Sequence, residues 1–107
     1  MSETYDVYQG QPEDADGQEW HVLVEYANRG DAKPPTLLKF PSGNFASREA
    51  AMVEAERQAY GFDPPDPMAP QGRQVFRDGE AFLTIVQGAM TTFHFSTRVV
   101  RYLGERS

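Results

Sequence analysis

Alternating hydrophobic and polar residues are clearest near the beginning of the chain, in the segment EWHVLVEYA. Successive side chains of a strand point to opposite sides, so this pattern predicts a β-strand with one buried face. One side would carry Trp20, Val22, Val24 and Tyr26, and the other His21, Leu23 and Glu25. After a turn-rich loop, TLLKF predicts a second, shorter strand that ends at Pro41.

The next pattern is helical and occupies REAAMVEAERQAY, which contains neither Gly nor Pro. Ser47 is placed to cap its N-terminus, and Gly61 is the expected residue just beyond its C-terminus. Ala51, Ala55 and Ala59 recur along one side of this helix. Such a narrow stripe of small side chains would let the helix approach a sheet closely.

Three more strands are predicted after a proline-rich loop, in RQVFR, EAFLTIVQ and MTTFHFSTRVVRYL. The DG pair at 78–79 favours a two-residue type I′ turn, which would place Arg77 opposite Glu80. The GA pair at 88–89 favours a type II′ turn. The resulting order, β-β-α-β-β-β, predicts an α+β fold: a mainly antiparallel sheet of four or five strands with one helix packed on one face.

These turns also assign the side chains of the last three strands to faces, because residues opposite each other share a face. The first face would carry Val75, Phe82, Val86, Phe93, Phe95, Val99 and Leu103. The second would carry Phe76, Ala81, Leu83, Ile85, Val100 and Tyr102, together with His94, Ser96 and Arg98. Both faces are rich in apolar residues, whereas a half-exposed antiparallel sheet is normally apolar on one face only. We expect the alanine stripe of the helix to cover the first face, over Phe82, Phe93 and Phe95.

The second face therefore needs another cover, and we predict that it is an interface. Its candidate residues are Phe76, Leu83, Ile85, His94, Arg98, Val100 and Tyr102. Three covers stay open: strands from the ends of the sheet, the N-terminal segment, or another protein chain. The prediction is a protein partner or a homodimer, for which a two-fold arrangement is the simplest closed form.

Charge is distributed unevenly along the chain, whose net charge is −6. Six of the sixteen acidic residues lie within residues 1–19, where there is no Lys or Arg. This predicts an acidic, flexible arm over residues 1–18, ahead of a single α+β domain over residues 19–104. An acidic arm repels nucleic acid and anionic lipid, and no apolar run is long enough to span a bilayer. We expect a cytoplasmic protein with neither nucleic acid nor membrane among its partners.

Candidate chemistry is sparse. The chain has no cysteine, which excludes disulfides and thiolate chemistry. Each histidine shares a predicted strand face with polar residues, His21 with Glu25 and His94 with Ser96 and Arg98. Residues two apart on a strand lie about 7 Å apart, which is unfavourable for a His–Ser nucleophile pair. We therefore expect no enzyme, no cofactor and no metal site.

The segment GFDPPDPMAPQG joins the helix to the later strands and is interpreted as a stiff spacer, since proline fixes the backbone φ. Asp63, Asp66 and Met68 within it form a secondary binding candidate. GFDPPD followed by RQVFRDG is similar to the passage from helix to strand in ubiquitin-like β-grasp domains. The resemblance implies one helix packed on a sheet and transfers no site residue. The chain departs from it by ending in YLGERS rather than Gly-Gly and by its meander of three strands.

Together these patterns favour a small, non-catalytic module that self-associates or binds a protein partner through its second sheet face. Two alternatives from other classes stay open. One is a small-molecule-binding or enzymatic site between helix and sheet, which would need a pocket with converging polar groups. The other is an acidic inhibitor or immunity-type protein whose N-terminal arm attracts a basic partner.

Overall fold

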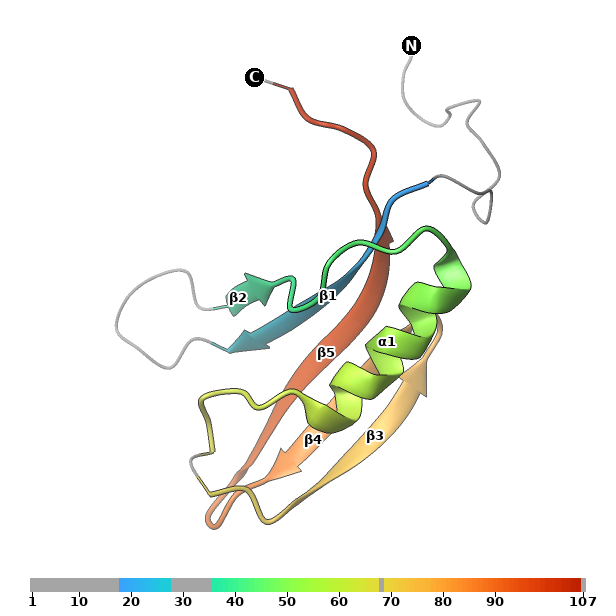
Figure 1. Cartoon of the computed structure of the whole chain (residues 1–107). Coiled ribbons are helices and arrows are strands. Elements are labelled where there is room, and N and C mark those ends of the chain that lie inside the picture. Colours follow the sequence, from blue (N-terminus) through green and yellow to red (C-terminus); the bar gives the residue numbers. More distant parts are fainter. Residues whose placement is uncertain (1–17, 28–35, 68, 107) are drawn as a thin grey trace.

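The computed structural model describes residues 18–27, 36–67 and 69–106 of the 107-residue chain (Figure 1). Its elements are β1 (Trp20–Ala27), β2 (Thr36–Lys39), α1 (Arg48–Gly61), β3 (Gly72–Asp78), β4 (Ala81–Gln87) and β5 (Thr92–Arg101). This β-β-α-β-β-β order, with the helix packed against the sheet, confirms the predicted α+β fold.

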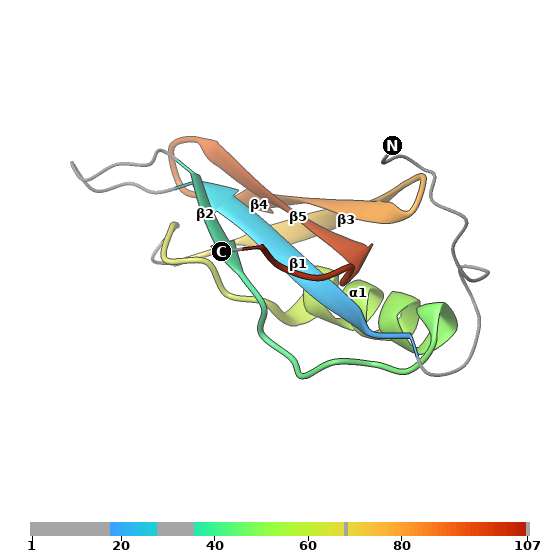
Figure 2. The ribbon, with the colours of Figure 1, turned by 90° about the horizontal axis from the view of Figure 1, so that it is seen from above.

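The five strands form one antiparallel sheet in the order β2-β1-β5-β4-β3. β5 lies in the middle, between β1 and β4, and α1 packs over β5, β1 and β4 on one face (Figure 1, Figure 2). β3, β4 and β5 follow one another as a meander, the feature by which the chain departs from the β-grasp resemblance. Within the described ranges, no helix has the length and apolar character that crossing a bilayer requires.

The ends of α1 show which local signals were interpreted correctly. Ser47 caps the N-terminus as predicted, because its side chain accepts a hydrogen bond from the backbone N–H of Ala50 at 3.1 Å. Gly61, in contrast, is the last residue of the helix rather than the residue beyond it. The N–H of Phe62 donates to Gln58 O at 2.8 Å, so an extended aromatic residue ends the helix instead of a left-handed glycine.

The helix lies close to the sheet because the side chains between them are small. Ala51, Ala55 and Ala59 are fully buried, as the stripe predicts. Two buried threonines of the sheet reach the helix backbone: Thr84 Oγ1 donates to Ala59 O and Thr97 Oγ1 to Ala55 O, both at 2.9 Å. These bonds satisfy hydroxyl groups whose burial without a partner would destabilise the fold.

Larger apolar side chains lie around this contact. Phe82 and Phe95 are buried on the helix side of the sheet, as expected. Phe93 is only half-buried and lies against the loop between β4 and β5 rather than beneath the alanine stripe. The last turn of α1 lies over Thr84, whose side chain donates to Ala59 O. Thr84 pairs with Phe95, and Phe93 is two residues closer to the β4–β5 loop than Phe95, so it lies beyond the end of the helix.

The turn between β3 and β4 is displaced by one residue from its predicted place. β3 ends with Asp78, so the turn consists of Gly79 and Glu80. Gly79 has φ +62°, the left-handed region that glycine tolerates best, and this requirement fixes the turn. Arg77 and Glu80 therefore do not face each other: Arg77 Nε donates to Gly79 O at 2.6 Å, and Glu80 forms an ion pair with Arg48.

The connection between β4 and β5 is also longer than predicted. Gln87 pairs with Thr92, so the loop contains the four residues 88–91 rather than a two-residue turn. Gly88 N–H donates to Thr91 O at 2.9 Å. A Cβ atom on Gly88 would lie 2.8 Å from this oxygen, so glycine is required here by close approach and not by a positive φ.

The displaced turns nevertheless leave the side chains on their predicted faces. Val75 lies opposite Thr84 instead of Phe82, which is a displacement of two residues along β4. Side chains alternate with a period of two, so an even displacement preserves the face of every residue.

Candidate functional site

The face of the sheet opposite α1 is called the open face, and it carries all seven residues of the predicted interface. The strand register places Ile85 opposite His94, Phe76 opposite Leu83, and Val100 opposite His21 of β1. Arg98 lies opposite Leu23, and Tyr102 continues the line of β5, where its N–H donates to Glu19 O at 2.9 Å.

Apolar side chains on the open face remain accessible. Phe76 is 47% and Tyr102 49% exposed, while Leu83, Ile85 and Val100 are half-buried. In the described part of the chain, α1 lies on the other side of the sheet, and no helix or strand covers this face (Figure 2). Of the three predicted covers, curling of the sheet ends is absent from the described residues. The arm, apart from its last residue, lies outside them, and another chain stays a prediction.

The charged residues at the centre of the open face are paired with each other. Arg98 Nη2 donates to Glu25 Oε1 at 2.9 Å, between β5 and β1. Glu25 is therefore the partner of Arg98 and not of His21, with which it shares a face. His94 is exposed nearer the β4–β5 loop, and among the described contacts it makes no hydrogen bond to Ser96.

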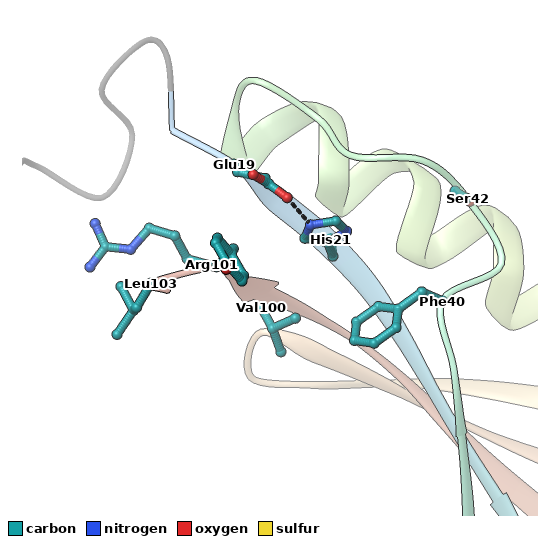
Figure 3. A pocket seen from close by; sticks show the side chains of 8 residues that line it. Glu19, His21, Phe40, Ser42, Val100, Arg101 and Leu103 are labelled. Carbon is teal, nitrogen blue, oxygen red and sulfur yellow. Dashed lines mark hydrogen bonds and ion pairs between the residues drawn. The ribbon is translucent and has the colours of Figure 1, made fainter. Parts of the chain in front are cut away.

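A cavity of about 610 Å³ lies at the end of this face, where β1 begins and β5 ends (Figure 3). Three segments form it: the start of β1, the segment that follows β2, and the end of β5 with the residues after it. Its lining consists of Glu19, His21, Phe40, Ser42, Val100, Arg101, Tyr102 and Leu103. Half of these residues are apolar or aromatic, namely Phe40, Val100, Tyr102 and Leu103, and the other half carry polar side chains.

An acid–imidazole pair forms one wall of the cavity. Glu19 Oε2 and His21 Nε2 lie 2.7 Å apart, within hydrogen-bond distance (Figure 3). The ring of Phe40 meets the His21 ring edge-on, with 5.5 Å between centroids. Figure 3 shows the Phe40 ring projecting from its segment toward His21 and Val100.

The positive charge of Arg101 is directed to the helix side of the sheet. Its Nη1 donates to Gln18 Oε1 at 2.9 Å, and its guanidinium carbon lies 5.9 Å from the centre of the Trp20 ring. Trp20 belongs to the core beneath α1. Glu19 is therefore the charged group that the cavity wall offers on the open face.

The segment carrying Phe40 is tied to the helix through the next polar residue, Ser42. Ser42 Oγ donates to Glu54 Oε2 at 2.7 Å. Glu54 also accepts from Arg57 Nη2 at 2.6 Å and from Gln58 Nε2 at 2.7 Å. The Arg57 guanidinium, with the bonds from Ser42 and Gln58, lowers the pKa of Glu54 from 4.5 to about 2. This carboxylate thus holds one wall of the cavity in place.

Sequence reasoning found only part of this cavity. It placed Val100, Tyr102 and His21 on the correct face, but it did not consider Glu19 and Phe40 as site residues. Alternation along β1 could have indicated Glu19, which is two residues before His21 on the same face. Phe40 carries no such signal, because its place depends on how β2 pairs with β1.

The proline loop is tied to the sheet by an arginine. Arg73 Nη1 donates to Phe62 O at 3.0 Å and to Ala59 O at 3.2 Å, and Nη2 lies 3.4 Å from Asp63 Oδ1. Of the secondary binding candidates, Asp63 is exposed beside this arginine and Asp66 lines a hollow of about 160 Å³. Met68 lies outside the described residues.

No group of three or more His, Asp or Glu side chains in the described ranges is arranged to hold a metal ion. Comparison with models of protein families, with characterised proteins and with solved structures finds no significant match. Functional inference therefore rests on the geometry of the open face and of the cavity.

Proposed function

We propose that the chain is an interaction module that self-associates through its open face as a two-fold dimer. The observation that supports this proposal is the accessible apolar surface over Phe76 and the half-buried Leu83, Ile85 and Val100, on a face that no described element covers. Burying apolar surface contributes roughly 25 cal/mol per Å², which favours a partner on this face over water.

The size of the face sets the scale of an interface with a second copy. Strands lie about 4.8 Å apart and rise about 3.3 Å per residue, so five strands with a mean length of about seven residues span roughly 20 by 23 Å. This projection of roughly 460 Å² is about half of the ~800 Å² per partner of a standard interface, so a dimer through this face alone would belong to the small interfaces.

The charges of the face also suit a second copy. Arg98 and Glu25 neutralise each other within one chain, so an identical face brings no unpaired charge against them. A basic or acidic partner would find no unpaired charge of opposite sign at the centre of the face. An isologous arrangement, in which both copies use the same surface, closes the assembly at two.

A single polar substitution on the apolar part of the face tests the proposal. Ile85→Gln would place a side-chain amide in the dimer interface and remove apolar contact there. Burying a polar group without a hydrogen-bond partner is unfavourable, so the dimer should be weakened. Val53→Gln is the matched control, because Val53 is 71% exposed on α1, on the other side of the sheet. Light scattering and sedimentation velocity across the micromolar range measure the mass.

The wild type and Val53→Gln are expected at twice the 12.0 kDa of one chain, and Ile85→Gln at the monomer mass with an unchanged circular dichroism spectrum. A wild type that remains monomeric at the highest concentration contradicts the proposal. So does an Ile85→Gln variant whose dimer is as stable as that of the wild type.

A further inference from the structure

We propose that the cavity at the end of the open face binds a small organic cation, an ammonium group carried on an aromatic or aliphatic body. This site is distinct from the centre of the self-association surface and does not depend on it. Glu19 would bind the ammonium group, and Phe40, Val100, Tyr102 and Leu103 would surround the apolar body.

The dimensions of the cavity match a small molecule. Its volume of about 610 Å³ lies inside the range of roughly 300–1,000 Å³ that is typical of ligand sites. Phe40 is 55% exposed and Leu103 is exposed as well, so a ligand would remove their apolar surface from water.

The charge at the cavity selects a cation. Glu19 contacts His21 through Oε2, and no other partner of its carboxylate occurs among the described residues, which leaves Oε1 for a ligand. The Arg101 guanidinium, the nearest fixed positive charge in the lining, is held by Gln18 on the helix side. The Glu19 carboxylate would repel an anionic ligand, and a neutral ligand would form no ion pair with it.

The aromatic walls reinforce this selection. A cation is attracted to the face of a Phe or Tyr ring within about 6 Å of its centre, by roughly 0.5–2 kcal/mol. Phe40 and Tyr102 line the cavity together with the carboxylate of Glu19. A carboxylate beside aromatic rings therefore favours a ligand that combines an ammonium ion with an apolar group over a ligand that has only one of the two.

Three ligands that share one ring separate the contributions: 2-phenylethylammonium, 2-phenylethanol and phenylacetate. Affinities are measured by calorimetry, and the position of binding by ¹⁵N chemical shifts of His21 and Val100. The ammonium ion is expected to bind saturably, to shift both amides, and to bind at least about tenfold more tightly than the alcohol. Phenylacetate is expected to bind more weakly still. Equal affinity for all three, or no saturable binding of the ammonium ion, overturns the proposal.

Variants provide a second test on the folded chain. Glu19→Gln is expected to weaken ammonium binding at least about tenfold, and Phe40→Leu about threefold or more. Glu56→Gln, an exposed carboxylate on α1, is the matched control and should leave the affinity unchanged. Unchanged affinity in Glu19→Gln overturns the proposal.

The same titration on Ile85→Gln separates this site from self-association. Ile85 does not line the cavity, so ammonium binding that persists in this variant supports the site whether or not the wild type dimerises. Loss of binding in Ile85→Gln, with the fold retained, contradicts an independent cavity site.

Discussion

Replacement of Arg73 by methionine is expected to destabilise the fold, because this side chain joins β3 to the end of α1. The side chain is 17% exposed and makes bonds to Ala59 O and Phe62 O. Phe62 O has no other partner among the described residues, whereas Ala59 O keeps the bond from Thr84 Oγ1. The guanidinium carbon also lies 5.7 Å from the centre of the Phe95 ring.

The magnitude follows from these contacts. A hydrogen bond that involves a charged group contributes about 1.5–3 kcal/mol, and the cation–π contact adds about 0.5–1 kcal/mol. Methionine keeps the apolar stem packed, so Arg73→Met should lose about 2–4 kcal/mol of the free energy of unfolding. For a domain of this size, Tm should fall by roughly 10–20 °C.

Urea and thermal unfolding at one fixed protein concentration measure the loss, since the proposed self-association would make Tm depend on concentration. Arg77→Met is the control: Arg77 is on the same strand and face, but it is exposed, donates to the adjacent turn, and has its guanidinium carbon 5.3 Å from the centre of the Phe82 ring. Its loss should stay below about 1 kcal/mol. Combining Arg73→Met with Thr84→Val should cost more than the sum, because both side chains donate to Ala59 O. Equal losses for the two arginine variants would refute the reasoning.

Three further predictions concern other parts of the fold. The Arg57 guanidinium depresses the pKa of Glu54 to about 2, so its stabilising effect should be present above about pH 4.5 and lost as the pH falls toward 2. In urea titrations, the difference between the wild type and Glu54→Gln should shrink over that interval, and a difference that does not change with pH would count against it. Gly88→Ala should lower the free energy of unfolding by about 1–3 kcal/mol in chemical denaturation. Gly43→Ala, where nothing lies within 4 Å, should lower it less, and equal losses would contradict the close approach at Gly88. Thr97→Val should lose about 1 kcal/mol despite its similar shape, because it deletes a buried bond to the helix, and a gain in Tm would contradict this.

The arrangement of faces could be predicted from the sequence because it depends on periodicity alone. The alternation in β1 and β5 and the alanine stripe of α1 determine which sides are buried, and tertiary contacts then select among few arrangements. Errors in both hairpin turns did not disturb the faces, since each displaced the register by two residues. A displacement by one residue would have exchanged Leu83 and Ile85 with Phe82 and Thr84.

The cavity could not be predicted in the same way because its walls come from three separate segments. The sequence between β1 and β2 does not specify how far along β1 the second strand pairs, and that register decides whether Phe40 reaches His21. The partner of Arg98 presented the same difficulty: Glu25 is 73 residues away in sequence, and only the pairing of β1 with β5 brings them together. Local patterns indicate faces, whereas sites depend on register across long loops.

The two proposed activities meet at Val100 and Tyr102, which belong both to the open face and to the cavity. Linkage then requires reciprocity: if a second copy changes the affinity of the cavity for a cation by some factor, the cation changes the dimerisation constant by the same factor. A partner that covers Tyr102 would exclude the ligand, and a partner centred on Ile85 and Phe76 would leave the cavity open. Because the register places Ile85 and Val100 at opposite ends of the face, a dimer centred on β4 is the arrangement that permits both. Ammonium titrations at increasing protein concentration distinguish these cases, since exclusion predicts an affinity that falls as the dimer forms.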